Sequence, residues 1–200
     1  MKLYPQSMTR LIEELEKMPG IGQKTAERLA NYILRLPAED AMALAQAIQD
    51  LKKNVRNCSI CFNVTETDPC HICQDANRDR TVICVVEQPV DVITIEKTAQ
   101  YNGLYHVLLG HISPLESIDP EDLTIDGLLC RIKDGTIKEV IIATNLNMEG
   151  DATALYISKQ MEGNGKKITR LARGMPSGGQ LEYASVAVIA DSLQGRRLVQ

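Results

Sequence analysis

Two Cys-x-x-Cys pairs constrain the fold of this 200-residue chain more than any other feature. They lie eight residues apart within CSICFNVTETDPCHIC, residues 58–73. Each pair can present two thiolates on one tight turn, and two such turns complete the tetrahedral sulfur shell that Zn²⁺ prefers. Because four sulfur ligands leave no open position, we expect a structural zinc site. Its ligands are Cys58, Cys61, Cys70 and Cys73.

Other roles for these cysteines fit less well. A thioredoxin-like redox site needs a single pair where a βαβ unit begins. A nucleic-acid deaminase needs an H-x-E motif, which none of the three histidines provides. Since four sulfur ligands close the zinc shell, His71 is not expected to bind the metal. Disulfide bonds remain a minor alternative. The isolated Cys84 and Cys130 are expected to be buried apolar residues rather than ligands.

Composition narrows the cellular setting and the kind of partner. No export signal and no apolar run of membrane-spanning length occurs, and cysteines in metal spacing suit a reducing compartment, so we expect a cytoplasmic protein without membrane contact. The net charge is −4, but residues 1–57 hold nine Lys and Arg against seven Asp and Glu. A nucleic-acid surface is therefore expected in this part. Only 4% of residues are aromatic and Trp is absent, which favours contacts with the phosphate backbone over base stacking.

The segment KMPGIGQKTAERLA, residues 17–30, joins two amphipathic stretches through closely spaced glycines. Its spacing is wrong for a nucleotide P-loop, and it does not follow a strand, as a dinucleotide-binding glycine motif must. It predicts a helix capped by Ser7, a tight turn, and a second helix whose N-terminus faces an anion between Lys24 and Arg28. We interpret it as a helix-hairpin-helix that holds the DNA backbone; an ordinary helical hairpin is the alternative. A third helix with an apolar stripe should open at Pro37.

After residue 80 the pattern changes to short β-branched runs separated by helical segments. The strand candidates are TVICVV, YHVLL, EVIIAT and KITRLA, and residues 89–99 and 149–160 have helical patterning. This alternation predicts a parallel sheet covered by helices, so the whole chain is of mixed α+β and α/β class.

Three carboxylates follow two of these strands. Glu87 comes directly after TVICVV, and Glu149 and Asp151 come after EVIIAT. Because parallel strands end at one edge of a sheet, the three could converge on a hard cation, for which Mg²⁺ would be suitable. The alternative is that the acidic pair complements the dipole at a helix start.

The order of these motifs resembles the bacterial RecR family of recombination mediators along essentially the whole chain. Further segments that carry the resemblance are VVEQPVDVITIEKT, GHISPLESIDPEDL, ATNLNMEGDATALYI and GMPSGGQLEYA. The resemblance implies a helix-hairpin-helix DNA-binding domain (1–57), a four-cysteine zinc finger (58–73), a Toprim domain (81–176) and a C-terminal segment for subunit contacts (177–200). It also implies a ring-shaped homotetramer around single- or double-stranded DNA, without sequence specificity, that acts with RecO and RecF to load RecA at single-stranded gaps.

Carried over by position, the resemblance assigns the family's functional residues to this chain. The DNA-contacting positions are Gly20, Ile21, Gly22, Lys24, Thr25 and Arg28. The Toprim acidic positions are Glu87, Glu149 and Asp151, as ligands of Mg²⁺ or as a RecO contact. The second acidic cluster reads E-G-D where catalytic Toprim enzymes show D-x-D, and Ser185 and Val186 stand where the family usually has acidic residues. Asp191 follows VAVIA and so resembles the aspartate that ends a Walker B motif. The chain has no P-loop, however, so there is no bound nucleotide on which Asp191 could act.

We therefore expect a non-catalytic DNA-binding protein. The alternative is a divalent-metal Toprim enzyme that acts as a nuclease, topoisomerase or primase. A topoisomerase needs a tyrosine nucleophile opposite the acidic cluster, usually from another domain, and the chain has no obvious spare domain. Because structural zinc sites contribute folding free energy, we also expect Cys70→Ala to destabilise the whole N-terminal half.

Overall fold

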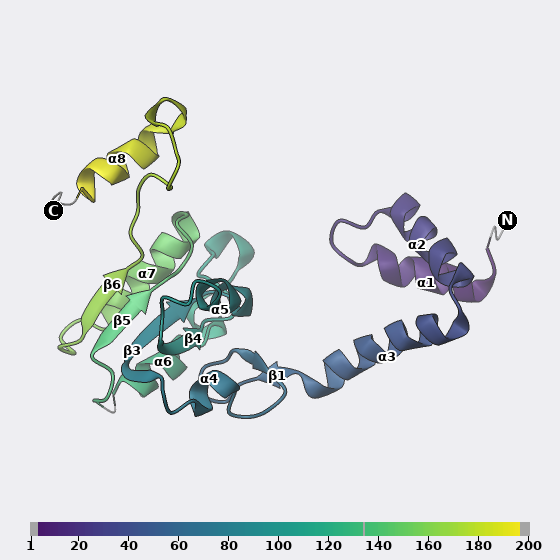
Figure 1. Ribbon diagram of the computed structural model, residues 1–200, viewed down its shortest axis with the longest axis horizontal. Helices are drawn as coiled ribbons and strands as arrows, with labels where there is room; N and C mark the ends of the chain where they lie inside the picture. The colour runs from purple at the N-terminus through teal and green to yellow at the C-terminus, as the bar shows by residue number, and fades with distance from the viewer. Residues whose placement is uncertain (1–3, 134, 197–200) are drawn as a thin grey trace. The chain divides into compact units, whose positions relative to one another are not determined.

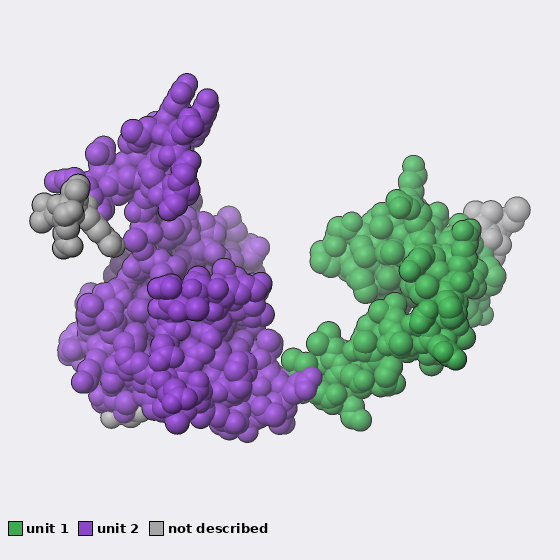
Figure 2. Space-filling model, in the orientation of Figure 1, with its two compact units in different colours: residues 1–55 green, residues 56–200 purple. Residues whose placement is uncertain are grey.

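The computed structural model describes residues 4–133 and 135–196. The chain divides into two compact units, residues 1–55 and 56–200 (Figure 2). The last residues of the predicted C-terminal segment, 197–200, lie outside the described part. No described helix is both long enough and apolar enough to cross a membrane.

Three helices make up the N-terminal unit (Figure 1). They are α1 (Gln6–Glu16), α2 (Gln23–Arg35) and α3 (Ala38–Asn54). Helices α1 and α2 pack through Ile12, Ala26 and Ala30, whose small alanine side chains let the helices approach closely. The prediction that Ser7 caps the first helix is wrong. The N-cap is Pro5, whose extended backbone starts the helix earlier and leaves Ser7 inside it.

Helix α3 begins directly after Pro37, as predicted. Its apolar stripe does not reach a core, because none of its residues is buried. Leu44, Ile48 and Leu51 are each about half exposed. The stripe is therefore a surface feature of this unit.

A four-stranded parallel sheet with the order β4-β3-β5-β6 organises the second unit. Its strands are β3 (Asp79–Val86), β4 (Gly103–Val107), β5 (Glu139–Ile142) and β6 (Lys167–Arg170). The helices between them are α5 (Pro89–Glu96), α6 (Ile125–Ile132) and α7 (Met148–Gln160), with the 3-10 turns η1 (Pro114–Glu116) and η2 (Pro120–Asp122) before α6. All four strand candidates and both helical segments are confirmed, and the mixed fold class with them.

Alternate residues of the central strand β3 belong to two separate cores. Ile83 and Val85 pack in the core that contains α6 and α7. Cys84 and Val86 pack in the other, with Val92 of α5 and the four paired cysteines. Cys84 is thus buried, as predicted. The same prediction for Cys130 is wrong, because α6 turns that side chain away from its buried face and exposes it.

Short elements complete the second unit. The cysteine segment, residues 56–74, contains the antiparallel pair β1 (Arg56–Asn57) and β2 (Val64–Thr65) and the single turn α4 (His71–Gln74). The C-terminal segment contains η3 (Leu181–Tyr183) and α8 (Val186–Gln194). Ser185 caps α8 by accepting the N–H of Val188. Since VAVIA is helical, Asp191 does not end a strand and only imitates a Walker B aspartate in sequence.

Candidate nucleic-acid interface and zinc centre

The turn between α1 and α2 leaves a helix N-terminus free. Gly20 has φ +80°, a left-handed conformation that glycine adopts without strain. The N–H of Ile21 donates to the backbone oxygen of Met18 at 3.1 Å and closes the turn. No side chain caps α2 at Gly22. The first N–H groups of α2 are therefore available to an anion such as a phosphate.

Positive side chains flank this N-terminus. Lys24 and Arg28 are exposed and lie one turn apart on α2. Within the described ranges, neither forms an ion pair with a carboxylate. Together with Arg35 they border a shallow hollow of about 530 Å³ along one side of the helix. The predicted DNA-contacting residues thus sit together on one continuous hairpin, with Ile21 packed against its small core.

The four paired cysteines converge on one point. All four sulfurs lie within 4.8 Å of one another. The Sγ–Sγ distance is 3.9 Å between Cys58 and Cys73 and 3.5 Å between Cys61 and Cys70. Tetrahedral zinc with Zn–S bonds of about 2.3 Å places its sulfurs about 3.8 Å apart. The site therefore fits zinc, and all four cysteines are free and not joined in disulfide bonds, whose sulfurs would lie about 2 Å apart.

The cysteines differ in acidity. Burial alone would raise the pKa of Cys58, but backbone N–H groups, including that of Cys70 at 3.3 Å, lower it to about 7. Burial raises the pKa of Cys70 to about 11. Since zinc binds thiolates, its binding must displace protons, and the affinity should fall as the pH falls.

The cysteine segment is built into the second unit and does not form a separate body. Its cysteines are 0–7% exposed and share a core with Tyr105 and Val107 of β4. The backbone oxygen of Cys61 accepts the N–H of Val107 at 2.8 Å. Phe62 packs edge-on against His106, with ring centroids 5.3 Å apart. The segment therefore covers the edge strand β4, which would otherwise leave unpaired backbone groups.

The acidic positions do not gather around a common point. Among the described residues, the four cysteines are the only group of three or more potential ligands close enough to share an ion. Glu87 is 2% exposed and accepts hydrogen bonds from Asn145, from the backbone N–H at 2.7 Å and from the side-chain amide at 2.6 Å. Its other neighbour is His111, whose Nδ1 lies 3.3 Å away. Glu87 thus ties the end of β3 to the loop after β5.

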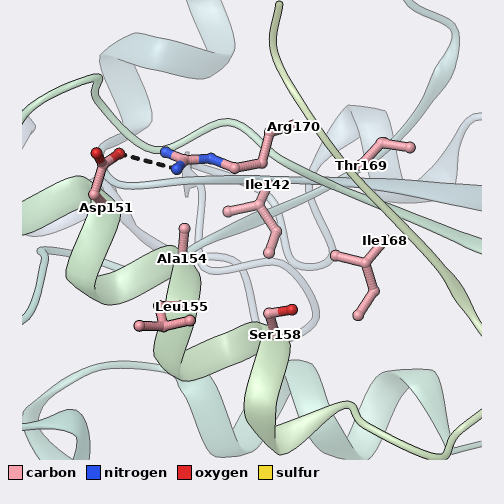
Figure 3. A pocket seen from close by; sticks show the side chains of 8 residues that line it. All are labelled: Ile142, Asp151, Ala154, Leu155, Ser158, Ile168, Thr169 and Arg170. Carbon is pink, nitrogen blue, oxygen red and sulfur yellow. Dashed lines mark hydrogen bonds and ion pairs between the residues drawn. The ribbon is translucent and has the colours of Figure 1, made fainter. Parts of the chain in front are cut away.

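Asp151 is also engaged. It lies in the first turn of α7, where Arg170 Nη1 approaches at 2.9 Å and Arg173 pairs with the same oxygen. Although partial burial opposes the change, these arginines lower the pKa of Asp151. Figure 3 shows the Asp151–Arg170 pair in a groove of about 310 Å³, bordered by the side chains of α7 and β6. Glu149, by contrast, stays partly exposed.

The glycine of the E-G-D segment has a packing role. A Cβ at Gly150 would lie 2.1 Å from the backbone oxygen of Asn145. The Asn147 side chain caps α7 by accepting the N–H of Gly150 at 2.9 Å. Both acidic residues of the segment fall in the first turn of α7, where negative charge complements the helix dipole. The alternative interpretation as helix-start residues therefore matches their position.

Several residues of these sites carry no signal in the sequence. Asn145, His111, Arg170 and Arg173 engage the acidic positions, and Arg131 and His106 lie beside the cysteine segment. Their partners are distant in the sequence, and no short motif contains them. The one local hint is their position at a strand end: Arg170 is the last residue of β6 and Arg173 follows it closely, as Glu87 follows β3.

Three features together define a class of multidomain DNA-binding proteins. They are a helical hairpin with exposed Lys and Arg side chains, a four-cysteine zinc centre, and a parallel sheet with acidic residues at its strand ends. Residues 8–52 match the RecR helix-hairpin-helix family, residues 55–75 match the RecR zinc finger domain with four cysteines, and residues 81–172 match the Toprim domain. Recombination protein RecR of Heliobacterium modesticaldum is 51% identical over 197 residues, which cover 98% of this chain and 99% of that protein. The chain therefore belongs to the RecR family.

Proposed function

We propose that the protein is a cytoplasmic recombination mediator that binds the DNA backbone and acts with RecO and RecF to load RecA at single-stranded gaps. The observation that carries the proposal is the exposed surface of α2, where an uncapped N-terminus lies beside Lys24 and Arg28. Such a surface contacts phosphates and not base edges, so it should accept single- and double-stranded DNA of any sequence. The recombination name of the Heliobacterium modesticaldum relative supports the pathway.

The proposal includes a homotetrameric ring that retains DNA by enclosing it. Two exposed apolar surfaces support subunit contacts. One is the stripe of Leu44, Ile48 and Leu51 on α3; the other is in the C-terminal segment, where Leu181, Tyr183 and Val186 are 69–85% exposed. Several large apolar side chains exposed within one short segment are consistent with a protein interface.

The proposal assigns a partner-binding role, and no catalysis, to the acidic positions. Hydrogen bonds already occupy Glu87, and two arginines neutralise Asp151, so neither presents a free carboxylate for Mg²⁺. Glu149 is partly exposed and offers a negative contact to a basic partner surface. We assign RecO to this contact because of the family resemblance.

DNA binding is tested by fluorescence anisotropy with labelled single-stranded and duplex oligonucleotides over a salt titration. Lys24→Ala and Arg28→Ala should each weaken binding to all sequences and reduce the salt slope by about one. Both side chains are exposed, so circular dichroism should show an intact fold. Lys159→Ala removes an exposed cation from α7 and serves as the control. Unchanged affinity and slope in both α2 variants would refute the proposed interface.

Catalysis is tested separately. The protein is incubated with supercoiled DNA, or with a single-stranded template and nucleotides, in Mg²⁺ or Mn²⁺. We expect no nick, relaxation or primer; a product that Glu149→Ala abolishes would make the protein a Toprim enzyme.

RecO binding should weaken in Glu149→Ala, and this variant is a cleaner test than Glu87→Ala because Glu87 is buried. RecO binding equal to that of the wild type would remove Glu149 from the proposed contact.

A further inference from the structure

Arg131 lies where α6 meets the edge strand β4. Its Nη1 donates to the backbone oxygen of Tyr105 at 2.7 Å and to Nδ1 of His106 at 3.1 Å. A guanidinium has no acceptor, so His106 Nδ1 accepts and the ring proton is on Nε2, which donates to the Thr124 backbone oxygen at 2.9 Å. Burial, together with the charge of Arg131, lowers the pKa of His106 to about 3. His106 is therefore neutral, and Arg131 alone supplies positive charge here.

This positive charge has no carboxylate partner among the described residues. Burial lowers the pKa of Arg131, and the four zinc-site sulfurs are the groups that oppose this change. The cysteine segment lies close to Arg131. Its Phe62 packs on His106, which Arg131 contacts, and the backbone oxygen of Cys61 accepts a hydrogen bond from the N–H of Val107, the next residue along β4. Arg131 is partly buried, and a guanidinium held away from water is costly unless an anion compensates it.

A zinc ion held by four thiolates supplies such an anion, because four negative sulfurs exceed the charge of the ion and leave a net negative centre. We propose that Arg131 is the counter-charge of the zinc centre, a positioning residue that α6 contributes to stabilise the tetrathiolate and hold the cysteine segment on β4. The assignment goes beyond the proposed function, in which Arg131 has no part.

The test measures zinc affinity in the purified, zinc-loaded full-length protein by competition with a colorimetric zinc-binding chelator. Loss of a group that supports a metal site from outside its ligand shell typically lowers metal affinity about 10–100-fold, so Arg131→Gln should lower the zinc affinity about tenfold or more. Arg131→Lys keeps the charge but not the planar fork, and should stay within about threefold of the wild type. Lys133→Gln removes an exposed cation at the C-cap of the same helix and should change nothing.

Comparing Arg131→Gln with Arg131→Lys separates the effect of charge on zinc affinity from the effect of packing. Wild-type affinity in Arg131→Gln would overturn the proposal. An equal loss in Arg131→Gln and Arg131→Lys would also overturn it, because the charge would then be irrelevant. If Arg131→Gln does not fold, Arg131→Lys decides alone: affinity near that of the wild type supports the counter-charge, and a loss of about tenfold or more contradicts it.

Discussion

At the scale of single residues, Glu87 shows how a strand-end carboxylate can serve the fold. Its side chain is almost fully buried, yet both oxygens have partners in the loop after β5 or in His111. A buried carboxylate with such donors stabilises the structure, whereas an unsatisfied one would destabilise it. The loop that carries Asn145 thus depends on Glu87.

This dependence predicts the effect of Glu87→Gln. The new amide can still accept the Asn145 N–H, but its NH₂ group then faces the Asn145 side-chain NH₂, and two donors oppose each other. We expect a loss of about 1–3 kcal/mol in the free energy of unfolding, measured with urea. Glu149→Gln, which alters a partly exposed side chain, should stay within about 0.5 kcal/mol of the wild type. Equal stability of the two variants would show that the Glu87 contacts contribute little.

The zinc ligands could be predicted from the sequence, and the partners of the acidic residues could not. Two Cys-x-x-Cys pairs fix their own geometry within a few residues. Asn145 is 58 residues from Glu87 and Arg170 is 19 residues from Asp151, so these contacts depend on the folded sheet and not on a local motif. The prediction that the three carboxylates converge on one cation was based on their common sheet edge. Such an edge brings strand ends together, but it does not set the direction in which each side chain points.

At the scale of elements, the α1–α2 hairpin uses its two glycines differently. Gly20 needs a positive φ, and a side chain there would be strained. Gly22 has φ −90°, which any residue adopts, and a Cβ there would meet no atom within 4 Å. The fold therefore requires glycine at position 20, while a side chain at position 22 would meet open space.

Gly22→Ala should separate DNA binding from folding. The added methyl group meets nothing in the protein, so the melting temperature should fall by only a few degrees, through a weaker cap worth about 1 kcal/mol at most. DNA affinity should fall several-fold, because the methyl group lies where the phosphate would approach the N-terminus of α2. Gly20→Ala is the matched comparison and should lower stability first. DNA affinity equal to that of the wild type in Gly22→Ala would place the phosphate elsewhere.

Element positions in the sheet could be predicted because β-branched runs and helical periodicity are local properties. The errors arose where one residue type has two uses. Ser7 is a good N-cap residue, but Pro5 precedes it and starts the helix. The stripe on α3 was predicted correctly, but its exposure could not be, because periodicity alone does not show whether an apolar stripe is buried.

At the scale of the whole molecule, the zinc site belongs with the sheet. The contribution of structural zinc to folding led us to expect that losing Cys70 would destabilise the N-terminal half. The structure argues for an effect on the other unit, because the cysteine segment is part of the unit 56–200 and its cysteines lie in the core beside β4. The helices of the N-terminal unit have their own small core around Ile12.

Zinc removal should therefore unfold one unit and spare the other. Zinc binding in small fingers is worth about 10–16 kcal/mol, comparable with the total stability of a domain, about 5–15 kcal/mol. After chelation at pH 6, where protons compete for Cys58 and Cys70, hydrogen exchange measured by mass spectrometry should accelerate in residues 56–74 and in β4. Exchange in α1 and α2 should not change. Cys130→Ser, at an exposed cysteine outside the site, should respond as the wild type does. Faster exchange in α1 and α2 with β4 still protected would restore the original expectation that the zinc centre stabilises the N-terminal half.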